Sequence, residues 1–282
     1  GDEESGGYGG VDWLAERGYF SPERVQHVII PEPLNKDRIC LGHRGVWWGA
    51  LETHGRIAHG SMPFLGDCAV RHMGAVIAEM EASLYPALAA RQTEMPVVPE
   101  GARQSTLNIN SLHGGQSEGA ADFTGLPSPC VPDSARMVLD RRFLMEENLA
   151  DVEGEIRDLL ENLRKTRPNF RYDLREMHHV LPSMTDQEAP VVTSVASAIG
   201  AVLGRAPDYV VSPGTYDQKH IDRIGRMKNC IAYGPGILDL AHQPDEYVGV
   251  DDMIDSAKVM GLSLAHLLAG ETLDDNSGPA RT

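Results

Sequence analysis

The stretch VWWGALETHGR, residues 46–56, begins with aromatic and aliphatic side chains and predicts a β-strand. It opens a central segment, residues 45–179, in which further apolar patterns predict a long helix, two strands, a second helix and a last strand. These elements are expected at residues 68–90, 105–112, 134–143, 146–164 and 170–177. The order βαββαβ forms a four-stranded antiparallel sheet with two helices on one face, which makes a compact unit.

The segments on either side of this unit predict α/β structure with a different rhythm. Before it, a short helix near residues 10–14 and an apolar strand at residues 25–30 form one α/β unit. After Pro182 the predicted order is helix, strand, strand and helix, at residues 189–203, 209–211, 229–233 and 250–268. We therefore expect an α/β protein with a central, mostly parallel sheet, into which a smaller ferredoxin-like unit is inserted. The polar tail, residues 272–282, is expected to be disordered.

Composition limits the classes of partner. The formal charge of -16, from 41 acidic and 25 basic residues, comes without any run of Lys and Arg that could follow a phosphate backbone, so no nucleic-acid partner is expected. The four cysteines form no CxxC pair, which argues against a thiolate zinc site and a disulfide scaffold and favours a reducing cytoplasm. No apolar run approaches the roughly 20 residues that a membrane helix needs, so no membrane association is expected.

Two acidic positions and one histidine could carry metal chemistry. Glu3 and Glu4 are adjacent in a glycine-rich loop, where one could bind a metal ion while the other faces a water molecule, although most Glu-Glu pairs are solvated surface. Glu32 follows an apolar strand between two prolines, at the kind of strand end where α/β sheets bind ligands, but it could equally belong to a plain turn. His242 lies in a Gly/Pro-rich loop after the last strand, where a neutral imidazole can bind a metal ion. Such oxygen and nitrogen ligands suit a catalytic zinc, cobalt or manganese site.

Together these positions resemble a family of zinc-dependent amidohydrolases and peptidases that includes acetylornithine deacetylase, succinyl-diaminopimelate desuccinylase, aminoacylase and carboxypeptidase G. The opening DEESGG is similar to the family's acidic loop, PEP around Glu32 to its next carboxylate, and GPGILDLAHQPDE to its last histidine motif. The resemblance implies Glu3 as the general base and Glu4, Glu32 and His242 as metal ligands. It also implies two Zn²⁺ ions per active site in the intact protein, with Co²⁺ or Mn²⁺ as alternatives.

The central segment resembles the lid and dimerisation domain of the same family. It is introduced by GHRG at residues 42–45 and continues with GRIAHGSMP at residues 55–63. The resemblance implies a homodimer in which His59 stabilises the oxyanion in the active site of the partner subunit. It also implies that residues 1–44 and 181–271 are two parts of one catalytic domain, with the lid and dimerisation domain at residues 45–180 between them.

Four further residues are implied to contact the substrate. Arg142, in the stretch DRR, is at the position expected to grip a substrate carboxylate, a task suited to a planar and permanently charged guanidinium. Arg44 lies in GHRG, and the two arginines together suggest a carboxylate-bearing substrate. Gly214 and Thr215 belong to a GTYD turn that resembles the turn lining the family's substrate pocket.

The sequence also departs from the family pattern. The family's first metal-binding histidine and its bridging aspartate precede the acidic loop, so we expect them upstream of Gly1 and expect this chain to be N-terminally truncated and weak or inactive alone. The leading interpretation is hydrolysis of the amide bond of an N-acyl amino acid, of the acetylornithine deacetylase or succinyl-diaminopimelate desuccinylase type. A di-zinc dipeptidase or carboxypeptidase would use the same residues on a short peptide. An inactive partial copy would keep only the fold and the dimer contacts.

Overall fold

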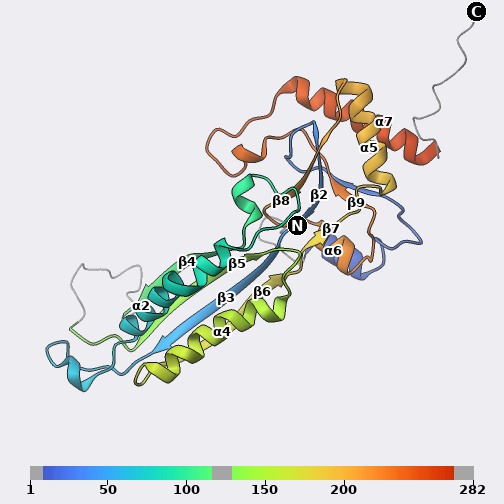
Figure 1. Ribbon diagram of the computed structural model, residues 1–282. Helices are drawn as coiled ribbons and strands as arrows, with labels where there is room; N and C mark the ends of the chain where they lie inside the picture. Colours follow the sequence, from blue (N-terminus) through green and yellow to red (C-terminus); the bar gives the residue numbers. More distant parts are fainter. Residues whose placement is uncertain (1–8, 116–128, 270–282) are drawn as a thin grey trace, which may run out of the picture. The chain divides into compact units, whose positions relative to one another are not determined.

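The computed structural model describes residues 9–115 and 129–269, so Glu3, Glu4 and the tail at 272–282 lie outside the described residues. The chain divides into two compact units (Figure 1). Unit 1 is made of Gly1–Arg44, Glu94–Gly101 and Pro182–Thr282, and unit 2 of Gly45–Thr93 and Ala102–Leu181. The short segment Glu94–Gly101 therefore belongs to unit 1 although it lies between two parts of unit 2 in the sequence.

Unit 2 is a four-stranded antiparallel sheet in the order β4-β5-β3-β6. Its strands are β3 (Gly45–His54), β4 (Thr106–Gly114), β5 (Ser134–Phe143) and β6 (Arg171–Val180). Its longer helices are α2 (Ala69–Glu79) and α4 (Leu149–Thr166). The π-helical turn Met80–Leu84 joins α2 to α3 (Tyr85–Ala89), so the single helix expected at residues 68–90 has an irregular middle. The predicted βαββαβ order is confirmed.

Alternation along the central strands of unit 2 separates a core face from an outer face. On β5 the odd-numbered residues from Ala135 to Phe143 are buried, whereas the even-numbered ones are exposed or half-buried. The buried side chains of β3 and β5 form one apolar cluster with α2 and α4, which cover this face. Trp47 of β3 is fully buried in the cluster, and its indole Nε1 donates a hydrogen bond to Glu153 of α4 at 3.1 Å. Arg142 therefore lies on the outer face.

Unit 1 contains a mixed five-stranded sheet among its described residues. Its strands are β1 (Val28–Ile30), β2 (Arg38–His43), β7 (Ser183–Met184), β8 (Asp208–Ser212) and β9 (Cys230–Ala232). The pairs β1–β9 and β2–β8 are parallel, and the pairs β2–β9 and β2–β7 are antiparallel. Its helices are α1 (Val11–Glu16), α5 (Pro190–Leu203), α6 (Gln218–Arg223) and α7 (Val250–Ala269). Strand β2 pairs with three others and is the centre of this sheet.

An apolar hollow lies between β1 and α7 in unit 1. It is lined from the β1 side by His27, Ile29 and Pro31 and from α7 by Met260, Leu264 and Leu267. Among the described strands, β1 pairs with β9 alone and forms one edge of the sheet. Leu264 is half exposed and Leu268, one turn further on, is 87% exposed, so apolar surface continues along this helix.

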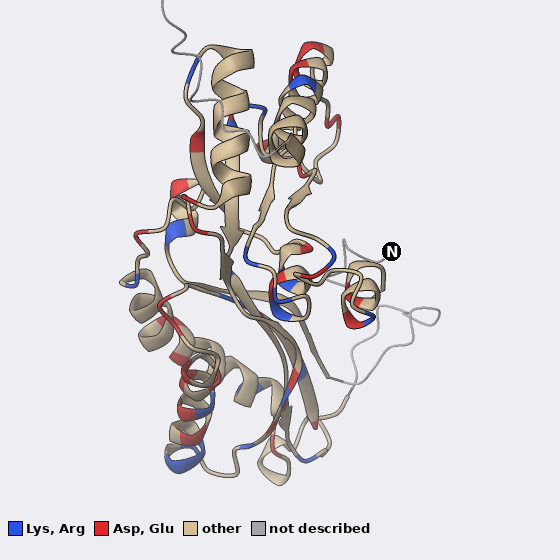
Figure 2. Ribbon diagram, turned by 90° about the vertical axis from the view of Figure 1, so that its right-hand side faces the viewer, with Lys and Arg blue, Asp and Glu red and all other residues tan. Residues whose placement is uncertain are grey.

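Charged residues are spread over the described chain rather than gathered by sign. In Figure 2 the basic segments are interspersed with acidic ones along the ribbon. All four cysteines are free thiols. None of the helices in the described ranges is both long enough and apolar enough to cross a membrane.

The two glycines of the GHRG motif each stand where another group leaves no room for a side chain. A Cβ on Gly42 would lie 2.0 Å from the backbone oxygen of Ser183 in β7, and one on Gly45 would lie 2.4 Å from the ring of Phe143. The Phe143 side chain is fully buried in the apolar cluster of unit 2, and protein cores are packed too closely for such a ring to move easily.

We expect Gly45→Ala to lower the free energy of unfolding by about 2 kcal/mol, because the added methyl group overpacks the core against Phe143. Gly154→Ala in α4 is the matched control, since a Cβ there meets no atom within 4 Å. It should raise stability by about 0.5–1 kcal/mol through helix propensity. Urea denaturation of both variants measures the two effects, and equal shifts of the same sign would contradict the clash.

Candidate active site

The loops that follow β1 and β9 leave the sheet side by side, because the two strands are parallel neighbours with Ile30 opposite Ala232. The first loop carries Glu32 and the second carries the GPG stretch at residues 234–236. The backbone amide of Tyr233 donates to the carbonyl of Ile30 at 2.9 Å, which closes the two strand ends together. The structure thus joins two of the motifs that the sequence suggested for a metal site.

Glycine is required where these two loops touch. A Cβ on Gly234 would lie 2.3 Å from the backbone oxygen of Glu32, and one on Gly236 would lie 2.4 Å from Cβ of Pro33. The amide of Asn35 also donates to the carbonyl of Gly236 at 2.7 Å. The backbone around Glu32 is therefore held by the GPG stretch as well as by its flanking prolines.

Glu32 is half-buried, and its carboxylate lies close enough to two buried side chains to affect their ionisation. Burial raises the pKa of the Cys40 thiol to about 11, and the negative charge of Glu32 acts in the same direction. Burial also raises the pKa of Tyr216 well above its usual value, with smaller contributions from Cys40 and Glu32. The thiol and the phenol therefore both stay protonated at neutral pH.

The GTYD turn after β8 is held by Arg44. The Arg44 side chain donates from Nε to the carbonyl of Pro213 at 3.1 Å, and its amide donates to the carbonyl of Ser212 at 3.3 Å. The amide of Gly214 in turn donates to the hydroxyl of Ser212 at 3.2 Å. Arg44 is only 7% exposed, whereas Gly214 and Thr215 are half-buried. The structure therefore brings Arg44 together with Gly214 and Thr215, with Arg44 supporting the turn.

A buried polar network below the turn was not indicated by the sequence. The Tyr216 hydroxyl donates to Oε1 of Gln218, and the Gln218 amide nitrogen donates to the carbonyls of Leu41 and Cys230, both at 3.1 Å. The same nitrogen lies 3.1 Å from the hydroxyl oxygen of Thr185. One amide side chain thereby connects the turn to β2 and β9. No motif marks Gln218 in the sequence.

His43, the residue before Arg44, is a fully buried titratable group. It is 0% exposed, its Nδ1–H donates to the carbonyl of Arg44 at 2.8 Å, and its ring meets Tyr216 edge-on at 5.3 Å between centroids. Nε2 has no hydrogen-bond partner within the described ranges. Burial lowers the pKa of His43 to about 4, so the ring is neutral at pH 7.

His242 lies in the loop that continues from GPG after a 3₁₀ turn at Leu238–Leu240. The residue is exposed and has a φ of 62°, a left-handed conformation that non-glycine residues seldom adopt. In the described part of the chain, no group of three or more His, Cys, Asp or Glu side chains is placed to hold a metal ion. Glu32 and His242 therefore belong to no such group among the described residues, and Glu3 and Glu4 lie outside those residues.

His59 belongs to unit 2, in an exposed loop whose two ends meet at the isolated bridge between Arg56 and Asp67. His59 pairs as an isolated bridge with Cys130, and the amide of Gly60 donates to the carbonyl of Pro129 at 2.5 Å. The backbone amide of Ser61 donates to Nδ1 of His59 at 3.2 Å. Because an amide can only donate, Nδ1 must accept, and the proton of the neutral ring is on Nε2. His59 therefore presents an exposed N–H donor.

Arg142 also belongs to unit 2 and lies on the outer face of the sheet. Its Nε and Nη2 donate to the two carboxylate oxygens of Asp140 at 2.7 and 3.0 Å. Two residues apart on one strand, these side chains point to the same side, which permits the two-point contact. Asp140 was not identified from the sequence as a partner of Arg142, although the DRR stretch places the two residues two positions apart on one strand.

Comparisons with known proteins agree with these motifs. Residues 41–167 match the family described as the peptidase dimerisation domain. The chain is 24% identical over 270 residues to acetylornithine deacetylase of Myxococcus xanthus, covering 95% of this chain and 64% of that protein. It is 28% identical over 270 residues to succinyl-diaminopimelate desuccinylase of Methylorubrum extorquens, covering 90% and 60%. An M20 family metallo-carboxypeptidase from Sulfolobus solfataricus has a similar fold, with a TM-score of 0.69, 17% identity and coverage of 94% and 68%.

The chain is therefore similar to the M20 metallopeptidases, and its residues 41–167 match their dimerisation domain. Its M20 dimerisation domain match begins inside β2 and ends just after α4, so it takes in most of unit 2. The predicted fold class, an α/β protein with an inserted ferredoxin-like unit, is confirmed by this M20 fold. The chain spans less than two thirds of the length of the two curated M20 relatives, 64% and 60%.

We expect acid to destabilise the chain through His43. Its folded pKa of about 4 is below the ordinary value of 6.5, so the unfolded chain binds the proton first as the pH falls. Between pH 6.5 and 4 this residue alone should remove about 3 kcal/mol of stability. Urea denaturation at several pH values should show a shallower decline for His43→Asn, whose amide nitrogen takes the position of Nδ1 and can still donate to the Arg44 carbonyl. Parallel curves for the two proteins would contradict a neutral buried His43.

Proposed function

We propose that the whole protein hydrolyses the amide bond of an N-acyl amino acid in a metal-dependent reaction. The observation that carries the proposal is the contact between the Glu32 loop and the GPG loop that leads to His242, at the ends of the parallel strands β1 and β9. Strand ends of this kind are where α/β sheets place their ligands. The two curated relatives, a deacetylase and a desuccinylase, support an acyl amino acid as the substrate class.

The described donors fit a divalent metal ion by their chemistry. Glu32 offers a carboxylate on a backbone that two prolines and two glycines hold in place, and His242 offers an imidazole on an exposed loop. With Glu4 these are oxygen and nitrogen donors, the set that Zn²⁺ accepts and that Co²⁺ and Mn²⁺ share. We propose Glu4, Glu32 and His242 as ligands of a two-zinc site in the whole protein.

The side chains of this chain would then divide the work of hydrolysis. A divalent metal ion held by Glu4, Glu32 and His242 would supply polarisation of the amide carbonyl and a lower pKa of water. Glu3 accepts a proton from the attacking water and later gives it to the leaving amine, so the products are a carboxylate and an amine. The Nε2–H of His59 donates a hydrogen bond to the carbonyl oxygen as negative charge develops on it. Arg142 binds the carboxylate of the substrate, and Gly214 and Thr215 line the pocket.

We also propose a homodimer through unit 2 in a reducing cytoplasm. The match to a peptidase dimerisation domain supports the dimer, and the free cysteines support the compartment. The exposed position of His59 on a loop of unit 2 suits a role in the active site of the partner subunit. Peptides are the rival substrates, because the same residues would serve a dipeptidase or carboxypeptidase.

The proposal is tested by assaying the whole protein, supplemented with zinc or cobalt, on N-acetylornithine, N-succinyl-diaminopimelate and a dipeptide. We expect Glu3→Ala to lower kcat by roughly 10²–10⁴-fold while two metal ions stay bound. Glu32→Gln should lower the metal content as well as the activity. Glu188→Ala, an exposed glutamate outside the site, is the control. Turnover of the dipeptide alone would select a peptidase, and no turnover of any of the three would reject the proposal.

His59 should act on the transition state rather than on substrate binding. We expect His59→Ala to lower kcat by roughly 100-fold with little change in KM, because the donor is needed only once charge develops on the carbonyl oxygen. His113→Ala, another exposed histidine of unit 2, should leave both constants unchanged. Steady-state kinetics decide the matter, and a rise in KM at constant kcat would show that His59 binds the ground state instead.

A further inference from the structure

On the outer face of the sheet, Arg142 is hydrogen-bonded to Asp140 through one edge of its guanidinium, and the other edge stays available. Asp140 accepts hydrogen bonds from Nε and Nη2, which form the side edge of the guanidinium. The end edge, formed by Nη1 and Nη2, keeps donors in the fork geometry that matches a second carboxylate. No other described residue is bonded to this guanidinium, and the side chain is 23% exposed. Asp140 therefore decides which edge a ligand can reach.

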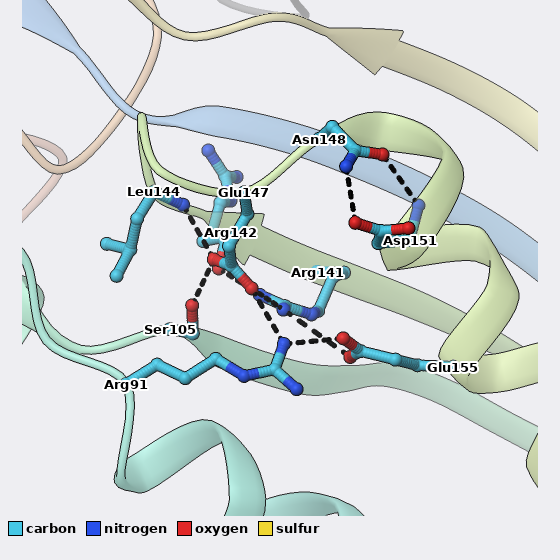
Figure 3. Close-up of polar contacts among 9 residues, drawn as sticks. All are labelled: Arg91, Ser105, Arg141, Arg142, Leu144, Glu147, Asn148, Asp151 and Glu155. Carbon is cyan, nitrogen blue, oxygen red and sulfur yellow. Dashed lines mark hydrogen bonds and ion pairs between the residues drawn. The ribbon is translucent and has the colours of Figure 1, made fainter.

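The opposite face of the same strand carries four charged residues, Arg91, Arg141, Glu147 and Glu155. We call them the buried ion cluster because Arg141 at its centre is fully buried, although the side chain of Arg91 at its rim is 35% exposed. Figure 3 shows these four side chains together below Arg142. Arg141 is 0% exposed, and its Nη2 donates to Glu147 at 2.6 Å. Arg91 donates to Glu147 at 2.9 Å and to Glu155 at 2.5 Å. Two positive and two negative charges make the cluster neutral, which offsets the cost of burying Arg141.

The buried ion cluster reaches the backbone of Arg142 and of the next turn. Nη1 of Arg141 donates to the carbonyl of Arg142 at 2.6 Å. Glu147 accepts a hydrogen bond from the amide of Leu144 at 2.8 Å and another from the hydroxyl of Ser105 on the approach to β4 (Figure 3). One guanidinium thus fixes the chain at residue 142 directly and at residue 144 through its glutamate partner.

Stability alone does not account for this arrangement. The neighbours of Arg141 on the core face of β5 are apolar, namely Leu139 and Phe143. An apolar side chain at this position would continue the pattern, and buried ion pairs are often replaced by apolar groups without loss of stability. What an apolar residue could not supply is the bond to the carbonyl of Arg142. The arginine therefore has a geometric role.

We propose that Arg141 is a positioning residue: through the buried ion cluster it fixes the backbone of Arg142, so that the Nη1/Nη2 edge binds one carboxylate of the substrate. The identity of the ligand rests on the proposed function, whereas the fixing of Arg142 does not. Asp140 restrains the guanidinium from its own face and Arg141 restrains the backbone from the other. A lysine at position 141 would keep the charge but could not bond Glu147 and the Arg142 carbonyl with one rigid fork.

The first test measures carboxylate preference in the whole protein, defined as kcat/KM for N-acetylornithine divided by kcat/KM for its α-carboxamide. We expect Arg142→Lys and Arg141→Lys each to lower this preference by about tenfold or more, mainly through KM. The double variant should be no worse than Arg142→Lys, because both changes remove one function. Arg167→Lys is the matched control, since this arginine bonds His72 and the Arg71 carbonyl elsewhere in unit 2. It should leave the preference unchanged.

A second measurement keeps the test independent of turnover. The Nε–H proton of Arg142, held by Asp140, should give a distinct and slowly exchanging NMR signal. We expect Arg141→Lys to broaden or shift that signal to the exposed-arginine position and Arg167→Lys to preserve it. If neither substrate is hydrolysed, the proposed function fails while this signal still decides the positioning role. An unchanged signal in Arg141→Lys, or an unchanged carboxylate preference in an active enzyme, would overturn the proposal.

Discussion

The parallel pairing of β1 with β9 is the constraint on which the candidate active site depends. Because the two strands run together, the loops at their ends must share one edge of the sheet, and they share it only because glycines at 234 and 236 allow backbone to lie against Glu32 and Pro33. The position of a carboxylate is thus set by residues that have no functional group of their own. In this site the glycines of GPG are as specific a requirement as the glutamate.

Strand β5 imposes a second constraint by a simpler rule. Successive side chains on a strand point to opposite faces, so neighbouring arginines at 141 and 142 enter different environments. One is enclosed beneath helices with glutamates, and the other lies on the outer face with an aspartate. A shift of one residue in the pairing of β3 with β5 would exchange their roles. Register in the apolar core therefore governs the polar chemistry on the other side of the sheet.

The sequence predicted best where one face of an element is buried and the other is not. Strand β5 was expected at residues 134–143 and has those bounds, because its alternation is clear. Strand β2 was not predicted as a strand of its own, because it is buried on both faces and its apolar and polar residues do not alternate. The segment Glu94–Gly101 contains two prolines and gave no strand signal, yet Val97 pairs with Val211 in unit 1. Its pairing depends on distant residues.

The site could be anticipated through motifs but not through its supporting contacts. Glu32, His242, His59 and Arg142 were each found from their local sequence, and their roles stay predictions. Gln218, which connects the GTYD turn to two strands, lies in no recognisable pattern. Its importance follows from the buried carbonyl groups around it, and these are brought together only by folding.

The edge of β1 affects how the isolated chain would behave in a test tube. Its outer backbone groups have no strand partner among the described residues, and the hollow beside it continues into exposed leucines on α7. An open strand edge next to apolar surface is a template for other chains. Loss of soluble material during storage should therefore depend on protein concentration and begin while every unit is still folded.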